Sequence, residues 1–279
     1  DGAGQKRVRV RRDEDIGNFY PHLWLGDDDR GLAFMGDSTR GWVLDEGRPC
    51  QDLIREAGRT VLRLHLVNTA VTLHDPVEAV LSLQATPVRP RPAGGSWRNV
   101  EWYGWGHFDE AVLWHNCFQP YKDGGLPAKN GPWYRTPEAK ERNLWWRYFC
   151  FQTHRVSVED PEYGDAIRRH ADEWGAGLHV PSHRDYLLWA YRQWHDIASL
   201  DGIYYDNTYA SPTTALGSGL AWRDASGKVH GSFNTFGDRE LMKRVRSYFL
   251  EQGPAPVLKV HITDAPIVGY LGFADFWLD

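Results

Sequence analysis

The C-terminal two thirds of the chain alternate between two kinds of apolar spacing, and this alternation restricts the fold more than any other feature. Short apolar runs bounded by turn residues are typical of buried strands, whereas apolar residues three and four positions apart are typical of helices with one buried face. We expect strands at 99–105, 143–153, 176–181, 202–206 and 257–263, and helices at 161–175, 182–197 and 238–253. Strands separated by helices predict a parallel sheet.

The N-terminal third has a different pattern, in which apolar and polar residues alternate over short runs. Residues 1–90 therefore read as several short strands joined by turns, which favours a β-sandwich. A stiff segment rich in proline and glycine follows at 86–96 and predicts a domain boundary near residue 93. We expect domains at 1–93 and 94–279.

The predicted fold class is α/β, with an N-terminal β-sandwich followed by a (β/α) barrel. Only five or six strands fit between residue 99 and the last residue, 279, although a closed barrel of this kind needs eight. The barrel is then incomplete, or the chain is a fragment of a longer protein. The first residue is Asp1 and not Met, and the sequence shows no signal-peptide pattern, so we expect a processed form or a fragment.

Composition excludes some classes of function and favours one. A net charge of −5 argues against a nucleic-acid partner, and no apolar run approaches the roughly 20 residues that a membrane-spanning helix needs. The three cysteines are widely spaced and predict neither a zinc site nor a disulfide framework. The 14 Trp, 13 Tyr and 11 Phe fit either an aromatic core or a cleft in which sugar rings stack on indole faces.

Ligands of parallel sheets bind beyond the carboxyl ends of the strands, and this rule selects candidate site residues. Asp206 and Asn207 directly follow the apolar run at 202–205 and are the strongest candidates. An Asx turn that merely ends the strand is the alternative reading. In a glycoside hydrolase, the Asp206 carboxylate would stabilise an oxocarbenium-like transition state, and Asn207 would hold a sugar hydroxyl or acetamido group.

Further carboxylates and polar side chains join Asp206 in this prediction. Asp264 and Asp275 are candidate acids, and His261 is either a binding residue or a satisfied rim residue. Aromatic residues near 102–105 are either a stacking platform or a plug at the bottom of the barrel. The predicted substrate-binding residues are Tyr205, Asn207, Trp102, Trp105, His107, His183, Arg184, Trp222 and His261. No cofactor is expected, although oxygen ligands from Asp206, Asn207 and Asp275 would suit Ca²⁺ as an alternative.

Five stretches of the sequence together carry a family resemblance. They are WLGDDDRGLAFMGDSTRGW, LSLQATPVRPRP, GIYYDNTYASP, GLAWRDASGKVHGSFNTFGDRELMKRV and VHITDAPIVGYLGFAD. From about Leu23 to Asp279, the chain resembles bacterial proteins similar to glycoside hydrolase family 123. The resemblance implies a β-sandwich followed by a (β/α)8 barrel, and activity on N-acetylgalactosaminides by substrate-assisted retention.

The resemblance also implies an adjacent Asp–Glu pair, in which the first residue orients the acetamido group and the second protonates the leaving oxygen. Asp206 matches the first position, but Asn207 stands at the second, and an amide cannot act as an acid. Another acid would have to serve, or the protein would be a carbohydrate-binding relative without catalysis. By analogy with polysaccharide-degrading enzymes, we expect a secreted or periplasmic protein with a carbohydrate partner; the sequence predicts no oligomeric state.

Overall fold

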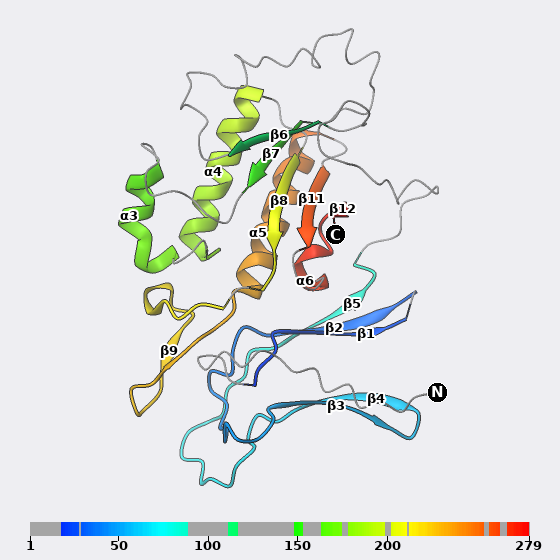
Figure 1. Cartoon of the computed structure of the whole chain (residues 1–279), viewed down its shortest axis with the longest axis vertical. Coiled ribbons are helices and arrows are strands. Elements are labelled where there is room, and N and C mark those ends of the chain that lie inside the picture. The colour runs from blue at the N-terminus through cyan, green and yellow to red at the C-terminus, as the bar shows by residue number, and fades with distance from the viewer. Residues whose placement is uncertain are drawn as a thin grey trace.

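The computed structural model has an N-terminal β unit and a C-terminal α/β unit (Figure 1). It describes residues 18–27, 29–88, 111–116, 148–152, 163–174, 178–198, 202–210, 212–253, 257–262 and 267–278. The predicted domain boundary at residue 93 and the predicted strand at 99–105 lie outside the described residues. No helix among the described residues is both long and apolar enough to cross a membrane.

The described residues of the N-terminal β unit form two small antiparallel sheets. Its strands are β1 (His22–Gly26), β2 (Gly31–Met35), β3 (Gln51–Glu56), β4 (Arg59–Leu64) and β5 (Ser82–Thr86). One sheet has the order β1-β2-β5, and the other is the β3-β4 hairpin. The hairpin turns at Ala57 and Gly58, which both have a positive φ, as a tight turn with the twist of a hairpin requires.

Both N-terminal sheets contribute to one hydrophobic cluster, which we call the N-terminal core. Leu23 and Phe34 enter it from the three-stranded sheet, and Leu62 and Leu64 from the hairpin. Phe233, about 170 residues further along the chain than β4, belongs to the same cluster and is only 8% exposed. The α/β unit therefore completes the core of the N-terminal β unit.

The α/β unit is built on a five-stranded parallel sheet with the order β12-β11-β8-β7-β6. Its strands are β6 (Ala111–Asn116), β7 (Tyr148–Gln152), β8 (Gly202–Thr208), β11 (Val257–Ile262) and β12 (Phe276–Leu278). Its helices are α3 (Tyr163–Trp174), α4 (Pro181–Ala198), α5 (Thr235–Gln252) and the short α6 (Val268–Leu271). A small hairpin of β9 (Trp222–Arg223) and β10 (Val229–His230) and the 3-10 turn η3 (Leu216–Ser218) lie between β8 and α5.

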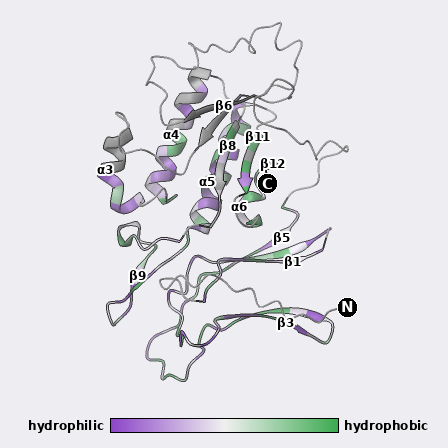
Figure 2. Cartoon of the chain, in the orientation of Figure 1, coloured by the Kyte–Doolittle hydropathy of each residue, from purple (hydrophilic) through white to green (hydrophobic). Residues whose placement is uncertain are grey.

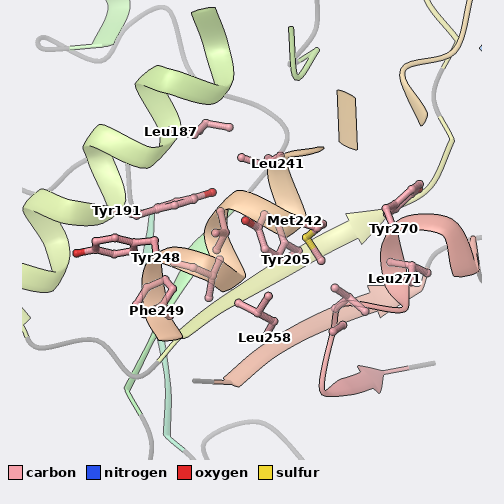
Figure 3. Close-up of a cluster of buried hydrophobic side chains, with 14 of the residues drawn as sticks. Leu187, Tyr191, Tyr205, Leu241, Met242, Tyr248, Phe249, Leu258, Tyr270 and Leu271 are labelled. Carbon is pink, nitrogen blue, oxygen red and sulfur yellow. The ribbon is translucent and has the colours of Figure 1, made fainter. Parts of the chain in front are cut away.

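The second hydrophobic cluster, the central core, joins α4 and α5 to the middle of the parallel sheet (Figure 3). Ile203 in β8 and Leu258 in β11 are both fully buried in it. Leu241 and Val245 place the inner face of α5 on these strands, as the helical spacing predicts. Figure 2 shows hydrophilic and hydrophobic residues in turn along α4, which also has one face in this core and another on the surface.

The predicted fold class, a β-sandwich followed by a (β/α) barrel, is wrong. The N-terminal β unit has five strands in two small sheets among its described residues, fewer than the roughly seven of an immunoglobulin-like sandwich. The five strands of the parallel sheet form an open sheet with β6 and β12 at its edges, and the described residues contain no closed barrel. Strand–helix alternation is common to open sheets and barrels, because closure depends on strand number and stagger rather than on local spacing.

Most predicted elements of the α/β unit are confirmed. Strands β7, β8 and β11 and helices α3, α4 and α5 occur where the apolar spacing places them, although α5 begins three residues before the predicted position 238. The predicted strand at 176–181 is wrong: residues 178–180 are not in a strand, and α4 begins at Pro181. Leu178 and Val180 are buried in one cluster with Trp174, so the apolar pattern here reflects packing against α3 and not a strand.

Candidate functional site

The carboxyl edge of the parallel sheet faces the N-terminal β unit. Strands β8 and β11 end at Thr208 and Ile262, and Figure 1 shows both arrowheads pointing toward the sheet that contains β1, β2 and β5. Helices that connect parallel strands run back against them, so α4 and α5 begin at this same edge. This is the edge at which open parallel sheets bind ligands.

A β-bulge at the end of β8 distinguishes this edge. Tyr205 pairs with Val260 and Thr208 pairs with Ile262, so Asp206 and Asn207 together stand opposite the single residue His261. A bulge changes the direction of side chains, and bulges are over-represented beside active sites. The register therefore brings three of the sequence-predicted site residues to one irregular position.

The residues on either side of the bulge are firmly held. Tyr205 is 3% exposed and Thr208 is 6% exposed, and the Thr208 hydroxyl donates a hydrogen bond of 3.4 Å to the Tyr205 carbonyl. This bond joins the two residues that flank the bulge. The bulge is thus a built-in feature of β8.

The Tyr205 side chain itself lies in the central core, where Figure 3 shows it beside Tyr191. Burial raises the pKa of the Tyr205 hydroxyl well above its usual range, and the neighbouring Tyr191 opposes this shift in part. A phenol in this position packs against α4 and α5, so we do not include Tyr205 among the sugar contacts proposed below.

Asp37, which the sequence analysis did not select, joins the N-terminal β unit to the start of α5. Its carboxylate oxygen Oδ1 accepts a hydrogen bond of 3.2 Å from the N–H of Phe236, and its backbone carbonyl accepts one of 2.7 Å from Phe233. Burial raises the pKa of Asp37 to about 7; the hydrogen bond from Phe236 opposes the shift, and the negative charge of Asp238 adds to it. Asp37, two residues after the end of β2, therefore caps the N-terminus of α5 in the other unit.

An imidazole–carboxylate pair joins the starts of α4 and α5. His179 Nδ1 and Asp238 Oδ1 are 2.6 Å apart, and His179 is only 5% exposed. Burial, together with the positive charge of Arg184, lowers the pKa of His179 to about 4, so the imidazole is neutral and its Nδ1–H donates to Asp238. Arg184 Nη1 donates a hydrogen bond of 2.6 Å to the His179 carbonyl.

Gly237, in the first turn of α5, packs directly against this pair. A Cβ at this position would lie 2.7 Å from the His179 carbonyl oxygen and would also collide with the Asn234 side chain. No residue with a side chain fits there without moving the start of one helix. The signal in the sequence was Asn234, a residue type favoured at the start of a helix, one position before α5 begins at Thr235.

Three other predicted site residues have structural partners. His183 Nδ1 lies 2.7 Å from the Leu178 carbonyl, and the His183 ring is buried and stacked on Trp174 at 4.6 Å. Trp222 stacks on His230 at 4.3 Å within the β9–β10 hairpin. Arg184 binds the His179 carbonyl as described above, and its Nε is buried without a hydrogen-bond partner among the described residues.

Asp275 lies at the other end of the sheet. Its carboxylate accepts hydrogen bonds from Arg246, at 3.0 and 3.2 Å, and from the N–H of Leu258, at 2.8 Å. Leu258 is near the amino end of β11, three residues before His261, which corresponds to about 10 Å along a strand. Asp275 is therefore committed to an ion pair away from the bulge, and we leave it out of the proposed site.

The remaining predicted residues, Trp102, Trp105, His107 and Asp264, lie outside the described residues. In the part of the chain that the structure describes, no group of three or more His, Cys, Asp or Glu residues could hold a metal ion. The suggested Ca²⁺ ligands Asp206 and Asp275 belong to opposite ends of the sheet, which argues against their sharing one ion.

Comparison with known proteins gave no match to a family model, to a curated protein or to a solved structure. The resemblance to glycoside hydrolase family 123 stays a prediction from the sequence.

Proposed function

We propose that this protein is a glycoside hydrolase whose active centre is the bulge of Asp206 and Asn207 at the carboxyl edge of the parallel sheet. The observation that carries the proposal is the register of β8 and β11, in which Asp206 and Asn207 stand opposite His261. Two further features support it: the edge is the usual ligand-binding edge of parallel sheets, and the sequence is rich in aromatic residues.

In the proposed reaction, the Asp206 carboxylate stabilises the positive charge that develops on the sugar ring as the glycosidic bond breaks, and water adds to the anomeric carbon and returns a proton to the general acid. Asn207 binds a hydroxyl or 2-acetamido group through its amide, which both donates and accepts hydrogen bonds. His261, opposite the bulge, contributes a further polar contact to the sugar. Asp264 is the proposed general acid, which protonates the leaving oxygen, because it follows the last residue of β11 by two positions in the sequence.

A second candidate function is carbohydrate binding without hydrolysis. The residue next to Asp206 is Asn207, and an amide cannot protonate a leaving oxygen as a neighbouring glutamic acid could. If Asp264 does not serve as the acid, the same edge would bind a sugar without cleaving it. By analogy with other polysaccharide-degrading proteins, we place the activity outside the cytoplasm.

The decisive experiment measures hydrolysis of a panel of aryl glycosides, including 2-acetamido sugars, by the wild type, Asp206→Ala and Asp275→Asn. We expect turnover by the wild type, a loss of at least about a thousandfold in Asp206→Ala, and near-normal kcat in folded Asp275→Asn. Addition of azide to Asp206→Ala is an independent check, because a small anion entering the vacated space restores turnover if the carboxylate acts at the reacting carbon.

Three outcomes separate the two candidates. Turnover that survives unchanged in folded Asp206→Ala would refute the central role of this residue. Sugar binding by calorimetry without turnover in the wild type would favour the binding protein. A wild type that neither binds nor hydrolyses any sugar of the panel would contradict both candidate functions.

A further inference from the structure

Five rings on α3 and α4 contact one another in series, and we call this set the aromatic shelf. Its members are His170, Trp174, His183, Tyr186 and Trp189. The centroids of Trp174 and His170 are 4.6 Å apart with the rings 8° from parallel, and those of Tyr186 and Trp189 are 5.8 Å apart at 22°. Tyr186 links the two halves, because its ring is also 5.0 Å from that of Trp174.

The inner part of the shelf is fixed by hydrogen bonds. Trp174 Nε1 donates to Ser182 Oγ at 2.8 Å, and Ser182 Oγ donates to Glu173 Oε1 at 2.6 Å. The other oxygen of Glu173 lies 3.0 Å from His170 Nδ1. Trp174 is 5% exposed, so the stack is held in place before any ligand arrives, which lowers the entropic cost of binding.

The outer end of the shelf is open to solvent. Trp189 is 49% exposed, one of the larger exposed values among the described hydrophobic residues of the α/β unit. Its ring is stacked on Tyr186 on one side, and about half of the residue is still open to solvent. A rigid indole face of this kind matches the apolar face of a sugar ring, whose C–H groups pack on aromatic rings.

The charges beside Trp189 indicate a neutral ligand. Asp185 is one helical turn before Trp189, and its carboxylate forms an ion pair of 2.7 Å with Arg244. The guanidinium of Arg192, one turn after Trp189, lies over the ring of Tyr248 at 5.4 Å. Both of these charged groups are engaged by residues of α5, Arg244 and Tyr248, which favours a neutral sugar over an acidic one at Trp189.

We propose that Tyr186 and Trp189 form a second carbohydrate-binding surface, which holds the chain of a neutral polysaccharide by stacking. The proposal rests on the proposed function only in its choice of sugar as the ligand. Trp189 is eight residues into α4, about 12 Å along the helix from the carboxyl edge of the sheet. A polysaccharide long enough to extend beyond the edge could engage both places, whereas a single aryl glycoside could not.

The test is affinity electrophoresis of the full chain in native gels that contain galactomannan, xylan, mixed-linkage β-glucan, dextran or, as an anionic probe, polygalacturonate. We expect at least one neutral polysaccharide to retard the wild type, and Trp189→Ala to weaken that binding about tenfold. Trp189→Phe should retain part of the affinity. The matched control is Trp277→Ala, because Trp277 is similarly exposed, at 46%, but lies on β12 away from the shelf.

Circular dichroism and thermal melting would verify that each variant is folded. Equal retardation of Trp189→Ala and the wild type would overturn the proposal, and so would a wild type that no polysaccharide retards. Retardation by polygalacturonate alone would overturn the neutral class of ligand. Hydrolysis of aryl glycosides should be unchanged in Trp189→Ala. A wild type that polysaccharides retard but that hydrolyses nothing would refute the proposed hydrolase and would still support this binding surface.

Discussion

Replacing Asp37 by asparagine should change how the stability of the protein depends on pH. Burial raises the pKa of Asp37 to about 7, whereas a carboxyl group in an unfolded chain titrates near 3.8. The unfolded chain therefore loses this proton first as the pH rises, and the stability that Asp37 contributes is fully present only below pH 3.8. That contribution is lost progressively until the folded protein also ionises near pH 7.

The size of the effect follows from the two pKa values. Each unit of difference corresponds to about 1.4 kcal/mol, so the full penalty at alkaline pH is roughly 4 kcal/mol. Between about pH 5 and pH 8, ionisation of Asp37 should cost the wild type roughly 2.5 kcal/mol of unfolding free energy. An asparagine in its place would keep an oxygen that can accept the hydrogen bond from Phe236 but has no proton to lose, so the variant should escape this cost.

The assay is urea unfolding of the wild type and Asp37→Asn at pH 5, 6, 7 and 8. Burial lowers the pKa values of His22 and His179 from 6.5 to about 4, so these two residues make the protein less stable as the pH falls below 6.5. This dependence on pH is opposite to that of Asp37. Both proteins contain these histidines, so the difference in unfolding free energy between variant and wild type isolates Asp37. We expect that difference to shift by roughly 2.5 kcal/mol in favour of the variant from pH 5 to pH 8.

Asp27→Asn is the matched control. Hydrogen bonds from the N–H groups of Arg30 and Asp29 lower the pKa of Asp27, so this carboxylate is ionised across the whole range and its replacement should add no slope. A variant-minus-wild-type difference for Asp37→Asn that stays constant between pH 5 and pH 8 would refute the reasoning.

Three other substitutions test the packing and the limits of the proposed site. Gly269→Ala should lower the unfolding free energy by about 1–3 kcal/mol in urea titrations, because its Cβ would collide with fully buried Met35 where α6 meets β2; a neutral result would contradict this close contact. Asp275→Ala should cost about 2–3 kcal/mol by the same measurement, since it leaves Arg246 without its carboxylate partner, while kcat of the folded variant stays near normal. Tyr205→Phe should leave KM for aryl glycosides unchanged, because the ring lies in the central core, and a raised KM would show that the phenol reaches the sugar.

Much of the α/β unit could be predicted from the sequence, because its elements depend on local spacing. The apolar residues of α5 recur on one helical face, and the apolar run before Asp206 is a strand in the structure, as expected. The rule that ligands bind at carboxyl ends also selected Asp206, Asn207 and His261 without any knowledge of pairing. These inferences need only neighbours in the sequence.

The remaining features depend on contacts between residues far apart in the chain, which local spacing does not predict. The bulge that sets Asp206 and Asn207 against His261 exists only in the register of β8 with β11, more than 50 residues away. Asp37 caps α5 across nearly 200 residues, and a carboxylate acquires a raised pKa only once folding has buried it. The open sheet in place of a barrel has the same origin, because the order and stagger of strands are long-range properties that local spacing does not encode.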